Sequence, residues 1–507
     1  MTPMPIPMRP LLALLLTLGS FAAATAAPLP DAGPAKLPRW RGFNLLEKFN
    51  FAGKHEAFRE DDFRLIAKFG FNFVRLPMDY RGYIVGGDWN RFDEEALGQI
   101  DQAVAWGRQY GIHVCLNLHR APGWTVAKPA EAKDLWSDAD ARQAAARHWA
   151  MFARRYKGIS NKNLSFNLFN EPSGVKADAY LVVVKEVVAA IRAEDPQRLV
   201  ECDGLQWGTL PVPELIPLKV AMMTRGYTPF QLTHYEASWV QGGASMPLPT
   251  WPEAGGTGGT LISPAKGALC HPLQISGALA AGARLRLVAT TLSSSAVLTL
   301  SDEADKELWR QSLSAGPEQG PWRKNALDPR WKCWQAEGEV EFNFTLPHPV
   351  KSLTLRVVDG DWLTLGLLGI RASEGAAEAV ARLTPSWDQA PETLCYSAAD
   401  PSKPKLGVPH DRAWLRAQTI PPWQAFAAAG GGVMVGEWGA YQNTPHPVVL
   451  GWAEDCLRNW QDAGWGWALW NFRGSFGIFD SGRKDVTYET FDGHQLDRKY
   501  LELLQRY

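Results

Sequence analysis

The sequence has no excess of charge of either sign and no closely spaced cysteines. Its 507 residues include 52 basic and 53 acidic side chains, which leaves a formal net charge of -1. A balanced chain has no electrostatic field that would gather nucleic acid or an anionic membrane surface. The six cysteines lack the spacing of a metal site, so neither a metal nor a nucleic acid partner is expected. These absences favour a neutral partner.

Long apolar runs are also scarce, and the run from Leu11 to Leu18 is too short to span a membrane. It follows Arg9 and precedes small residues through Ala26, which is the pattern of a signal peptide over residues 1–26. Residues 27–39 then form a Pro-rich leader. We therefore expect a secreted or periplasmic protein with no membrane span after signal removal, and a retained anchor is the alternative.

Export would permit disulfides among the six cysteines. Cys115 lies in an apolar, strand-like run and is expected to be a buried thiol. The spacing does not decide between pairings such as Cys270 with Cys333, or Cys395 with a neighbour.

Tryptophan is the residue type that stands out, with 23 copies. Its flat apolar face and single N–H donor suit sugar rings, which present flat C–H faces edged by hydroxyls. The alternative is that many of these rings fill the core. With 46% hydrophobic residues, the chain has enough core material for one barrel-sized domain and a second unit.

Two apolar strands far apart in the sequence each end in a glutamate. The segment LSFNLFNEPSG, residues 164–174, stops abruptly at Asn170 and Glu171, and GVMVGEWGAY, residues 432–441, delivers Glu437. Taken alone, the first acid is equally typical of the first turn of a helix. The two acids can meet only if their strands share one sheet. Retaining glycoside cleavage requires such a pair, about 5 to 5.5 Å apart.

Short apolar strands and amphipathic helices alternate eight times from Trp40 onward, with polar residues at the strand exits. This alternation predicts an α/β fold, a (β/α)8 TIM barrel whose active face is formed by the loops after the strands. The predicted strands cover residues 41–47, 71–80, 112–123, 164–174, 198–204, 220–230, 432–441 and 465–474.

The alternation fails over residues 242–384, which are rich in Gly, Ser and Thr and carry runs such as SAVLTLSD and EVEFNFTL. This pattern predicts a jelly-roll-like β-sandwich inserted after barrel strand six, so that the barrel occupies residues 40–241 and 385–507. The insert either binds carbohydrate through exposed aromatic residues or shapes the active mouth. The candidate aromatic residues are Trp309, Trp322, Trp331, Trp334 and Trp362.

Six motifs, in this order, resemble glycoside hydrolase family 5, the cellulase family of barrel enzymes. They are RLP at 75–77, LNLH at 116–119, FNEP at 169–172, YTPFQLTHYEASW at 227–239, GEWG at 436–439 and LWNF at 469–472. The resemblance covers residues 40–239 and 387–479. It implies a retaining mechanism without a metal or organic cofactor, with Glu171 as general acid/base and Glu437 as nucleophile.

The implied chemistry needs two glutamates in unlike surroundings. Glu171 must be protonated near neutral pH, which calls for partial desolvation and a neighbouring carboxylate, whereas Arg75 would favour ionised Glu437. Asn170 could donate to the sugar 2-hydroxyl, and Tyr227 could hydrogen-bond Glu437. Three further residues are expected to bind sugar hydroxyls, orient the carboxylates or lie under the ring: His119, His234 and Trp470.

One position departs from the family pattern. Members commonly have His-x-Tyr at the end of strand six, whereas this chain has Arg225-Gly226-Tyr227, and His234 follows later. Arginine cannot titrate as an imidazole does, because it is effectively always charged. Either Arg225 has a different electrostatic role or His234 supplies the missing contact. We expect Tyr227, rather than Tyr235, to be the tyrosine of the motif.

Other aromatic and acidic residues near the strand ends have two interpretations. Trp124, Trp207 and Trp239 are either sugar platforms or core residues. Trp438 is expected to pack in the core, and Glu47 to be an exposed loop acid.

Together these features predict a secreted, monomeric retaining β-glycosidase that acts on a β-linked glucan or a related polysaccharide or oligosaccharide. Mannan, xyloglucan and glycolipid substrates stay open, as does transglycosylation, which uses the same site but excludes water from the second step. The alternative from another class is a non-catalytic carbohydrate-binding or adhesion protein. The presence of both Glu171 and Glu437 argues against it.

Overall fold

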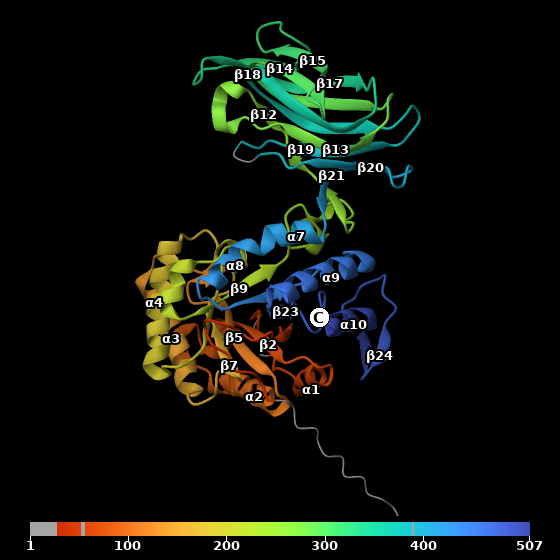
Figure 1. Cartoon of the computed structure of the whole chain (residues 1–507). Helices are drawn as coiled ribbons and strands as arrows, with labels where there is room; N and C mark the ends of the chain where they lie inside the picture. The colour runs from red at the N-terminus through yellow and green to blue at the C-terminus, as the bar shows by residue number, and fades with distance from the viewer. Residues whose placement is uncertain (1–27, 52–55, 388–389) are drawn as a thin grey trace, which may run out of the picture.

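Eight parallel strands close into a barrel, as predicted (Figure 1). The computed structural model describes residues 28–51, 56–387 and 390–507. Around the barrel the strands follow the order β2, β1, β23, β22, β9, β8, β7 and β5, and a pairing of β5 with β2 closes the ring. Their bounds are Arg41–Asn44 (β1), Phe73–Asp79 (β2), His113–Ala121 (β5), Leu164–Asn167 (β7), Val200–Asp203 (β8), Ala221–Gly226 (β9), Val433–Trp438 (β22) and Trp467–Leu469 (β23).

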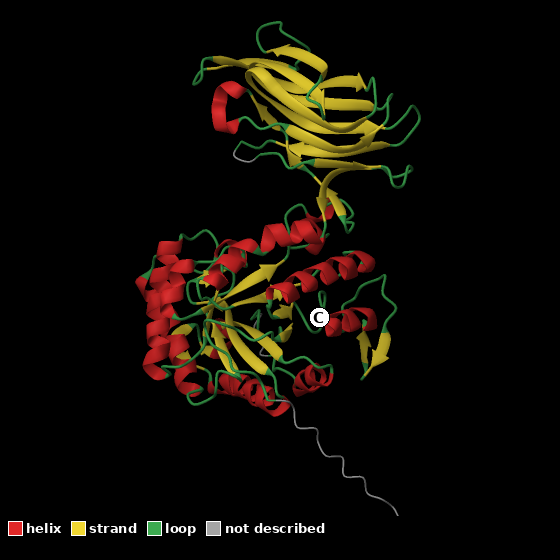
Figure 2. Ribbon diagram, in the orientation of Figure 1, coloured by secondary structure: helices red, strands yellow, loops and turns green. Residues whose placement is uncertain are grey.

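Helices surround the strands (Figure 2). Aspartates begin several of them, as Asp93 does by accepting hydrogen bonds from the first-turn amides of α2. After β8 the chain forms only the short α5 (Leu205–Gly208) and the 3-10 turn η2 (Pro213–Leu218) instead of a full helix. The other α-helices of the barrel are α1 (Glu60–Lys68), α2 (Glu94–Tyr110), α3 (Ala139–Arg155), α4 (Ala177–Glu194), the short α6 (Phe230–Thr233), α7 (Arg412–Thr419), α8 (Pro421–Ala428), α9 (His446–Ala463) and α10 (Arg498–Arg506).

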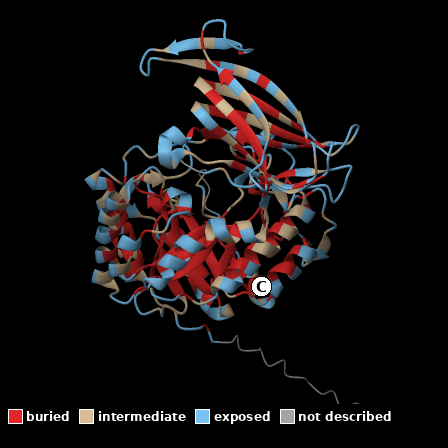
Figure 3. Ribbon diagram, turned by 45° about the horizontal axis from the view of Figure 1, so that its top comes forward, coloured by how far each residue is buried: buried red, intermediate tan, exposed pale blue. Residues whose placement is uncertain are grey.

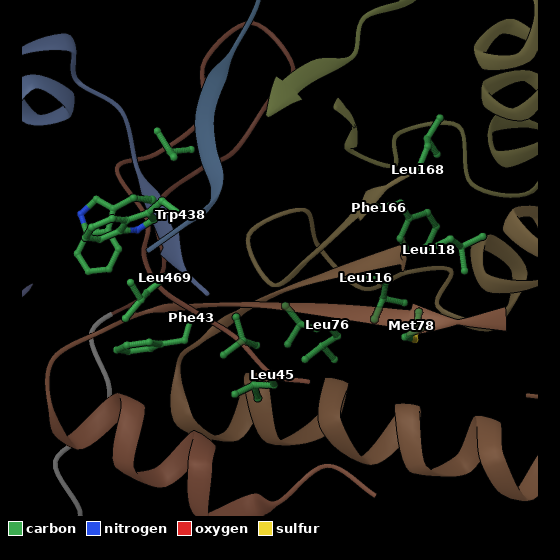
Figure 4. Packing of buried hydrophobic residues seen from close by; sticks show 14 of the residues in the cluster. Phe43, Leu45, Leu76, Met78, Leu116, Leu118, Phe166, Leu168, Trp438 and Leu469 are labelled. Carbon is green, nitrogen blue, oxygen red and sulfur yellow. The ribbon is translucent and has the colours of Figure 1, made fainter. Parts of the chain in front are cut away.

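Successive residues of each barrel strand face opposite sides, which separates the core from the site. On β2, Leu76 and Met78 pack outward against the helices, in the cluster drawn in Figure 4. Phe73 faces inward and belongs to a small apolar cluster with Met223 and Met434 that fills one end of the barrel. Arg75, two residues further along β2, lies in the polar layer at the other end. The barrel interior is therefore mainly apolar at one end, where His113 stacks on Trp40 and Phe73, and charged at the other.

The predicted signal peptide lies outside the described residues. The described part of the leader packs on the barrel, where the amide of Gly432 donates to the carbonyl of Pro34 at 2.7 Å and Leu37 is buried in the small apolar cluster. Over residues 28–51, 56–387 and 390–507, no helix has the length and apolar character needed to cross a membrane.

The insert after β9 is a mainly antiparallel β domain with its own apolar core (Figures 1 and 3). Two long strands, β14 (Arg284–Asp302) and β18 (Val350–Arg371), bend at several register shifts and organise its sheet. The other main strands are β12 (Thr260–Ile262), β13 (Leu273–Leu279), β15 (Glu307–Ser314), β16 (Lys324–Asp328), β17 (Cys333–Thr345) and β19 (Glu378–Thr384).

The inserted domain extends beyond the expected end at residue 384. β20 (Leu394–Ser397) pairs with β13, and β21 (Lys405–His410) pairs with β20 and with β10 (Glu253–Gly255). The barrel therefore resumes at α7, not at residue 385. The polar, Pro-containing stretch after Thr384 resembles a linker in the sequence, which explains the early boundary.

All six cysteines lie among the described residues, and all six are free thiols. The pairings considered from the sequence, Cys270 with Cys333 and Cys395 with a neighbour, are therefore not formed. Cys115 is a buried thiol, as predicted, and donates a hydrogen bond to Oε2 of Glu201 at 3.1 Å.

Candidate active site

Glu437 lies on β22 and is held from two sides. Nη1 of Arg75 donates to its Oε2 at 3.0 Å, and the hydroxyl of Tyr227 donates to its Oε1 at 2.9 Å. Burial and the neighbouring Glu437 carboxylate raise the pKa of Tyr227 well above its usual value, so Tyr227 remains a donor. Both carboxylate oxygens of Glu437 are thus fixed.

Arg75 is wholly buried and uses its whole guanidinium fork. Besides Glu437, it donates from Nη1 to Asn44 at 3.0 Å, from Nε to Asn167 at 3.0 Å and from Nη2 to Asn170 at 2.8 Å. These partners come from β1, β7 and the loop after β7. Arg75 therefore ties the site to three neighbouring parts of the barrel.

Asn170 has an amide whose orientation is dictated by two cations. Its Oδ1 accepts from Nη2 of Arg75 and, at 3.0 Å, from Nη2 of Arg225. Its buried Nδ2 has no hydrogen-bond partner among the described residues. Because an unsatisfied buried donor is costly, this N–H group is available for a ligand acceptor.

Glu171 follows β7 in a left-handed backbone conformation, with φ of +50°. Its amide donates to Oδ2 of Asp203 at 2.9 Å, which holds the chain in this strained conformation. Nε of Arg225 donates to its Oε1 at 3.1 Å. Burial, and then the nearby Glu437, raise the pKa of Glu171 to about 8 in spite of Arg225.

The two glutamates face the same nitrogen. Nε of Arg225 lies 3.1 Å from Oε1 of Glu171 and 3.8 Å from Oε2 of Glu437. The two oxygens are therefore at most about 7 Å apart, which is the scale of the gap that spans a scissile glycosidic bond.

The structure also distinguishes Arg225 from His234. Nε of Arg225 contacts Glu171 directly, whereas no hydrogen bond or ion pair joins His234 to Glu171 among the described residues. His234 instead stacks on Phe230 and packs edge-on against Tyr227, with its Nδ1 2.9 Å from the hydroxyl oxygen of Thr233. Its pKa is lowered to about 4, chiefly by burial. His234 thus supports the ring of Tyr227 and does not replace the contact made by Arg225.

His119 and Trp470 form a stacked pair with ring centroids 5.5 Å apart, and Phe49 meets both rings edge-on. Burial and the charge of Arg75 lower the pKa of His119 to about 3, so its imidazole is neutral. Nδ1 of His119 is buried without a hydrogen-bond partner among the described residues. His119 lies on β5 and Trp470 directly follows β23, so both rings lie at this mouth of the barrel.

The remaining tryptophans divide between surface and core. Trp207 and Trp239 are 54% and 59% exposed, whereas Trp124 is partly buried and donates from Nε1 to the carbonyl of Asn170 at 2.8 Å. Trp438 packs against three other tryptophans in the core, as expected. In the insert, Trp331 is exposed, but Trp322 is buried and is no candidate for surface binding.

Sequence reasoning missed Asp203 and misjudged Glu47. Asp203 ends β8, much as the two predicted acids lie at or just after the ends of their strands, so its position in RLVECDG was the signal that could have revealed it. Glu47 is not an exposed acid, since its side chain is only 10% exposed. Burial and the nearby Asp62 raise its pKa to about 7. No group of three or more His, Cys, Asp or Glu side chains within the described ranges is arranged to hold a metal ion.

Known proteins resemble this chain in sequence and in fold. Residues 31–232, which include Glu171, match the sequence model of cellulase, glycosyl hydrolase family 5. A crystal structure of a glycoside hydrolase superposes with a TM-score of 0.59 at 25% identity, covering 92% of this chain and 99% of that one. Over residues 31–232 the chain is thus similar to the cellulase family, glycosyl hydrolase family 5. The resemblance seen in the motifs is thereby confirmed.

Individual relatives match over a smaller part of the chain. Endoglucanase C of Acetivibrio thermocellus is 29% identical over 36% of this chain and 53% of its own length. Cellodextrinase A of Ruminococcus flavefaciens is 26% identical over 36% of this chain and 54% of its own length. The chain thus spans about half the length of these relatives. Endoglucanase Cel5A of Thermotoga maritima, 15% identical with a TM-score of 0.52 and covering 92% of this chain and 96% of that one, shares the fold.

Proposed function

We propose that this protein is a secreted retaining glycoside hydrolase that cleaves β-linked glucan or a related polysaccharide or oligosaccharide. The observation that carries the proposal is the pair of glutamates that face one guanidinium in unlike surroundings. Glu437 accepts hydrogen bonds on both oxygens from Arg75 and Tyr227, whereas Glu171 has a pKa raised to about 8. One acid is set to attack and the other to donate a proton.

In the first step, an ionised Glu437 oxygen forms a bond to the anomeric carbon while the bond to the leaving oxygen breaks. Glu171 gives its proton to that oxygen. In the second step, Glu171 takes a proton from water, the resulting hydroxide oxygen bonds to the anomeric carbon, and Glu437 leaves as a carboxylate. The free Nδ2 of Asn170 donates to the 2-hydroxyl, and Trp470 lies under the ring.

The name of one relative, endoglucanase, and the exposed Trp207 and Trp239 favour a chain of several sugar units as substrate. The predicted signal peptide supports export. Residues 28–51, 56–387 and 390–507 contain no membrane-crossing helix. We also propose that the chain acts as a monomer.

The test combines product analysis with two variants. The purified protein is incubated with defined β-glucans, mannans, xyloglucan and an aryl β-glycoside, and NMR identifies the first anomer released. We expect the β anomer. Glu171→Gln and Glu437→Gln are each expected to lose about 10²- to 10⁴-fold in kcat on the natural linkage.

Glu186→Gln is the matched control, because Glu186 is an exposed glutamate on α4. It should keep the wild-type rate. Release of the α anomer would overturn the retaining mechanism. Full activity in both site variants on every hydrolysed substrate would overturn the assignment of Glu171 and Glu437.

A further inference from the structure

Arg225 and Asp203 form a buried ion pair that contacts Glu171 at both its backbone and its side chain. Nη2 of Arg225 pairs with Oδ2 of Asp203, and the same Oδ2 accepts the amide hydrogen of Glu171 at 2.9 Å. Nε of Arg225 donates to Oε1 of Glu171 at 3.1 Å. Among the described residues, no side chain or amide donates to Oε2 of Glu171.

The barrel leaves space for the long side chain of Arg225. Gly208 has a φ of +78°, and a Cβ there would lie 2.6 Å from Cγ of Arg225. A Cβ on Gly436, the residue before Glu437, would lie 2.5 Å from Sδ of Met223 and 3.2 Å from Nη1 of Arg225. Two neighbouring segments therefore carry glycine where the guanidinium and its stem pass, which fits a built position for arginine.

We propose that Arg225 and Asp203 act as one positioning pair, which fixes Glu171 in its left-handed conformation and turns its Oε2 toward the leaving group. This inference rests on the proposed function. Nothing in the family motif supplies it, because that motif has a histidine where this chain has Arg225.

The pair also balances charge around Glu171. The groups that face this carboxyl are Glu437 from β22, Arg225 from β9, Asp203 from β8 and Arg75 from β2. With Glu171 protonated, the two guanidinium groups offset ionised Glu437 and Asp203, so the buried cluster has no net charge. A neutral imidazole in place of Arg225 would leave one negative charge uncompensated.

The two members of the pair act on Glu171 in opposite directions. Arg225 favours the ionised carboxylate and lowers the pKa of Glu171, whereas Asp203 disfavours it and raises that pKa. Burial without Arg225 would raise the pKa of Glu171 further and make it a weaker proton donor. Arg225 therefore makes proton donation easier and stabilises the carboxylate that remains after the first step.

Protonation of Glu171 can be measured directly, without turnover. Full-length protein labelled with ¹³C at the glutamate carboxyl carbon is titrated by NMR, and the Glu171 signal is the one missing in Glu171→Gln. In Arg225→Met we expect the pKa of Glu171 to rise by about one unit or more, and in Asp203→Asn to fall. Arg225→Lys keeps the positive charge, so its Glu171 pKa should lie close to the wild-type value.

A merely structural role predicts a different pattern. Loosening the site admits water, which would move the pKa of Glu171 down toward its ordinary value in both variants. An unchanged or lowered pKa in Arg225→Met would therefore overturn the inference.

Arg225→Met leaves Asp203 buried without its partner, and the protein could fail to fold. The double variant Arg225→Met/Asp203→Asn removes both charges, and far-UV circular dichroism checks its fold. Compared with Asp203→Asn alone, it differs by the charge of Arg225, so its Glu171 pKa should be higher. Equal values in these two variants would also overturn the inference.

Turnover is measured in parallel on a β-glucan oligosaccharide. If the wild type hydrolyses nothing but the titrations shift as expected, the proposed function fails while the positioning pair stands. If the wild type hydrolyses the substrate and the titrations do not shift, the positioning pair fails alone.

Discussion

The barrel and the inserted sandwich bury different kinds of side chain. Arg75, Asp203, Arg225 and Glu437 lie inside the barrel mouth with almost no exposure. The sandwich core consists mostly of leucine, valine and alanine, and within the described residues Asp302 is the single buried charged residue of the insert. Burying ions costs stability unless each is paired and hydrogen-bonded. The barrel tolerates this cost at the end where the chemistry is proposed to occur, whereas the core of the insert is mainly apolar.

Removing one partner from the buried charges is expected to have the largest effect. Arg75→Met removes the guanidinium that donates to Glu437 and leaves Oδ1 of Asn44 without its donor. We expect a loss of about 3 to 5 kcal/mol in the free energy of unfolding, measured by urea denaturation, together with loss of activity. Arg356→Met is the control from the insert, because the ion pair of Arg356 with Asp305 is largely exposed. A similar loss of stability in both variants would contradict this difference between the barrel and the insert.

The next prediction concerns how stability depends on pH. The pKa of Glu171 is about 8 in the folded protein, against an ordinary value of 4.5. The unfolded chain releases this proton above pH 4.5 while the folded chain keeps it until about pH 8, so rising pH destabilises the folded state across this window. Glu171→Gln should therefore be more stable than the wild type at pH 8, by at least about 1 kcal/mol, and equal to it at pH 4.

The stability contributed by Glu378 in the insert should depend on pH in the opposite direction. Its hydrogen bonds with Arg286 lower its pKa, so the ionised form stabilises the folded state above the ordinary pKa and this contribution is lost as pH falls. Glu378→Gln should be slightly destabilised at pH 8. Thermal unfolding of both variants at pH 4 and pH 8 measures the contrast, and a change of the same sign at pH 8 would contradict it.

A smaller effect is expected for Trp207→Ala. Trp207 is exposed, has a φ of +58°, and donates its amide hydrogen to the carbonyl of Pro172 at 3.3 Å. It therefore lies beside the segment that carries the proposed acid, on the leaving-group side. We expect a rise of a few-fold to about tenfold in KM for a β-glucan oligosaccharide, with kcat on an aryl glycoside unchanged.

Trp331→Ala is the control, because Trp331 is an exposed tryptophan of the insert. It should leave the KM for the same soluble oligosaccharide unchanged. An equal change in KM in the two variants would contradict the proposal that Trp207 binds sugar.

The smallest effect on the barrel is expected from removing the insert. Glu253 and His410 are directly paired neighbours in β10 and β21, so the two ends of the insert lie side by side. Replacing residues 253–410 with a short Gly-Ser link should leave a folded barrel that hydrolyses an aryl glycoside at close to the wild-type rate. Loss of cooperative unfolding would show that the barrel depends on the insert.

Patterns that repeat along the chain made the barrel predictable. Each strand alternates inward and outward residues and is followed by polar side chains, so the eight strands and the pair Glu171 and Glu437 could be recognised from spacing alone. Asp203 carried the same signal. The contact of Arg225 with Glu171 could not be predicted, because it depends on how β7, β8 and β9 are placed side by side. The end of the insert was hidden because β20 and β21 are short and follow a polar stretch.

The position of the insert within the chain has a further consequence. Glu171 precedes it and Glu437 follows it, so a single cut in the sandwich would yield two polypeptides that each carry one of the two acids. Neither fragment alone contains a complete site. Reassembly of the eight-strand ring would be required to restore it, which makes the protein suited to fragment complementation.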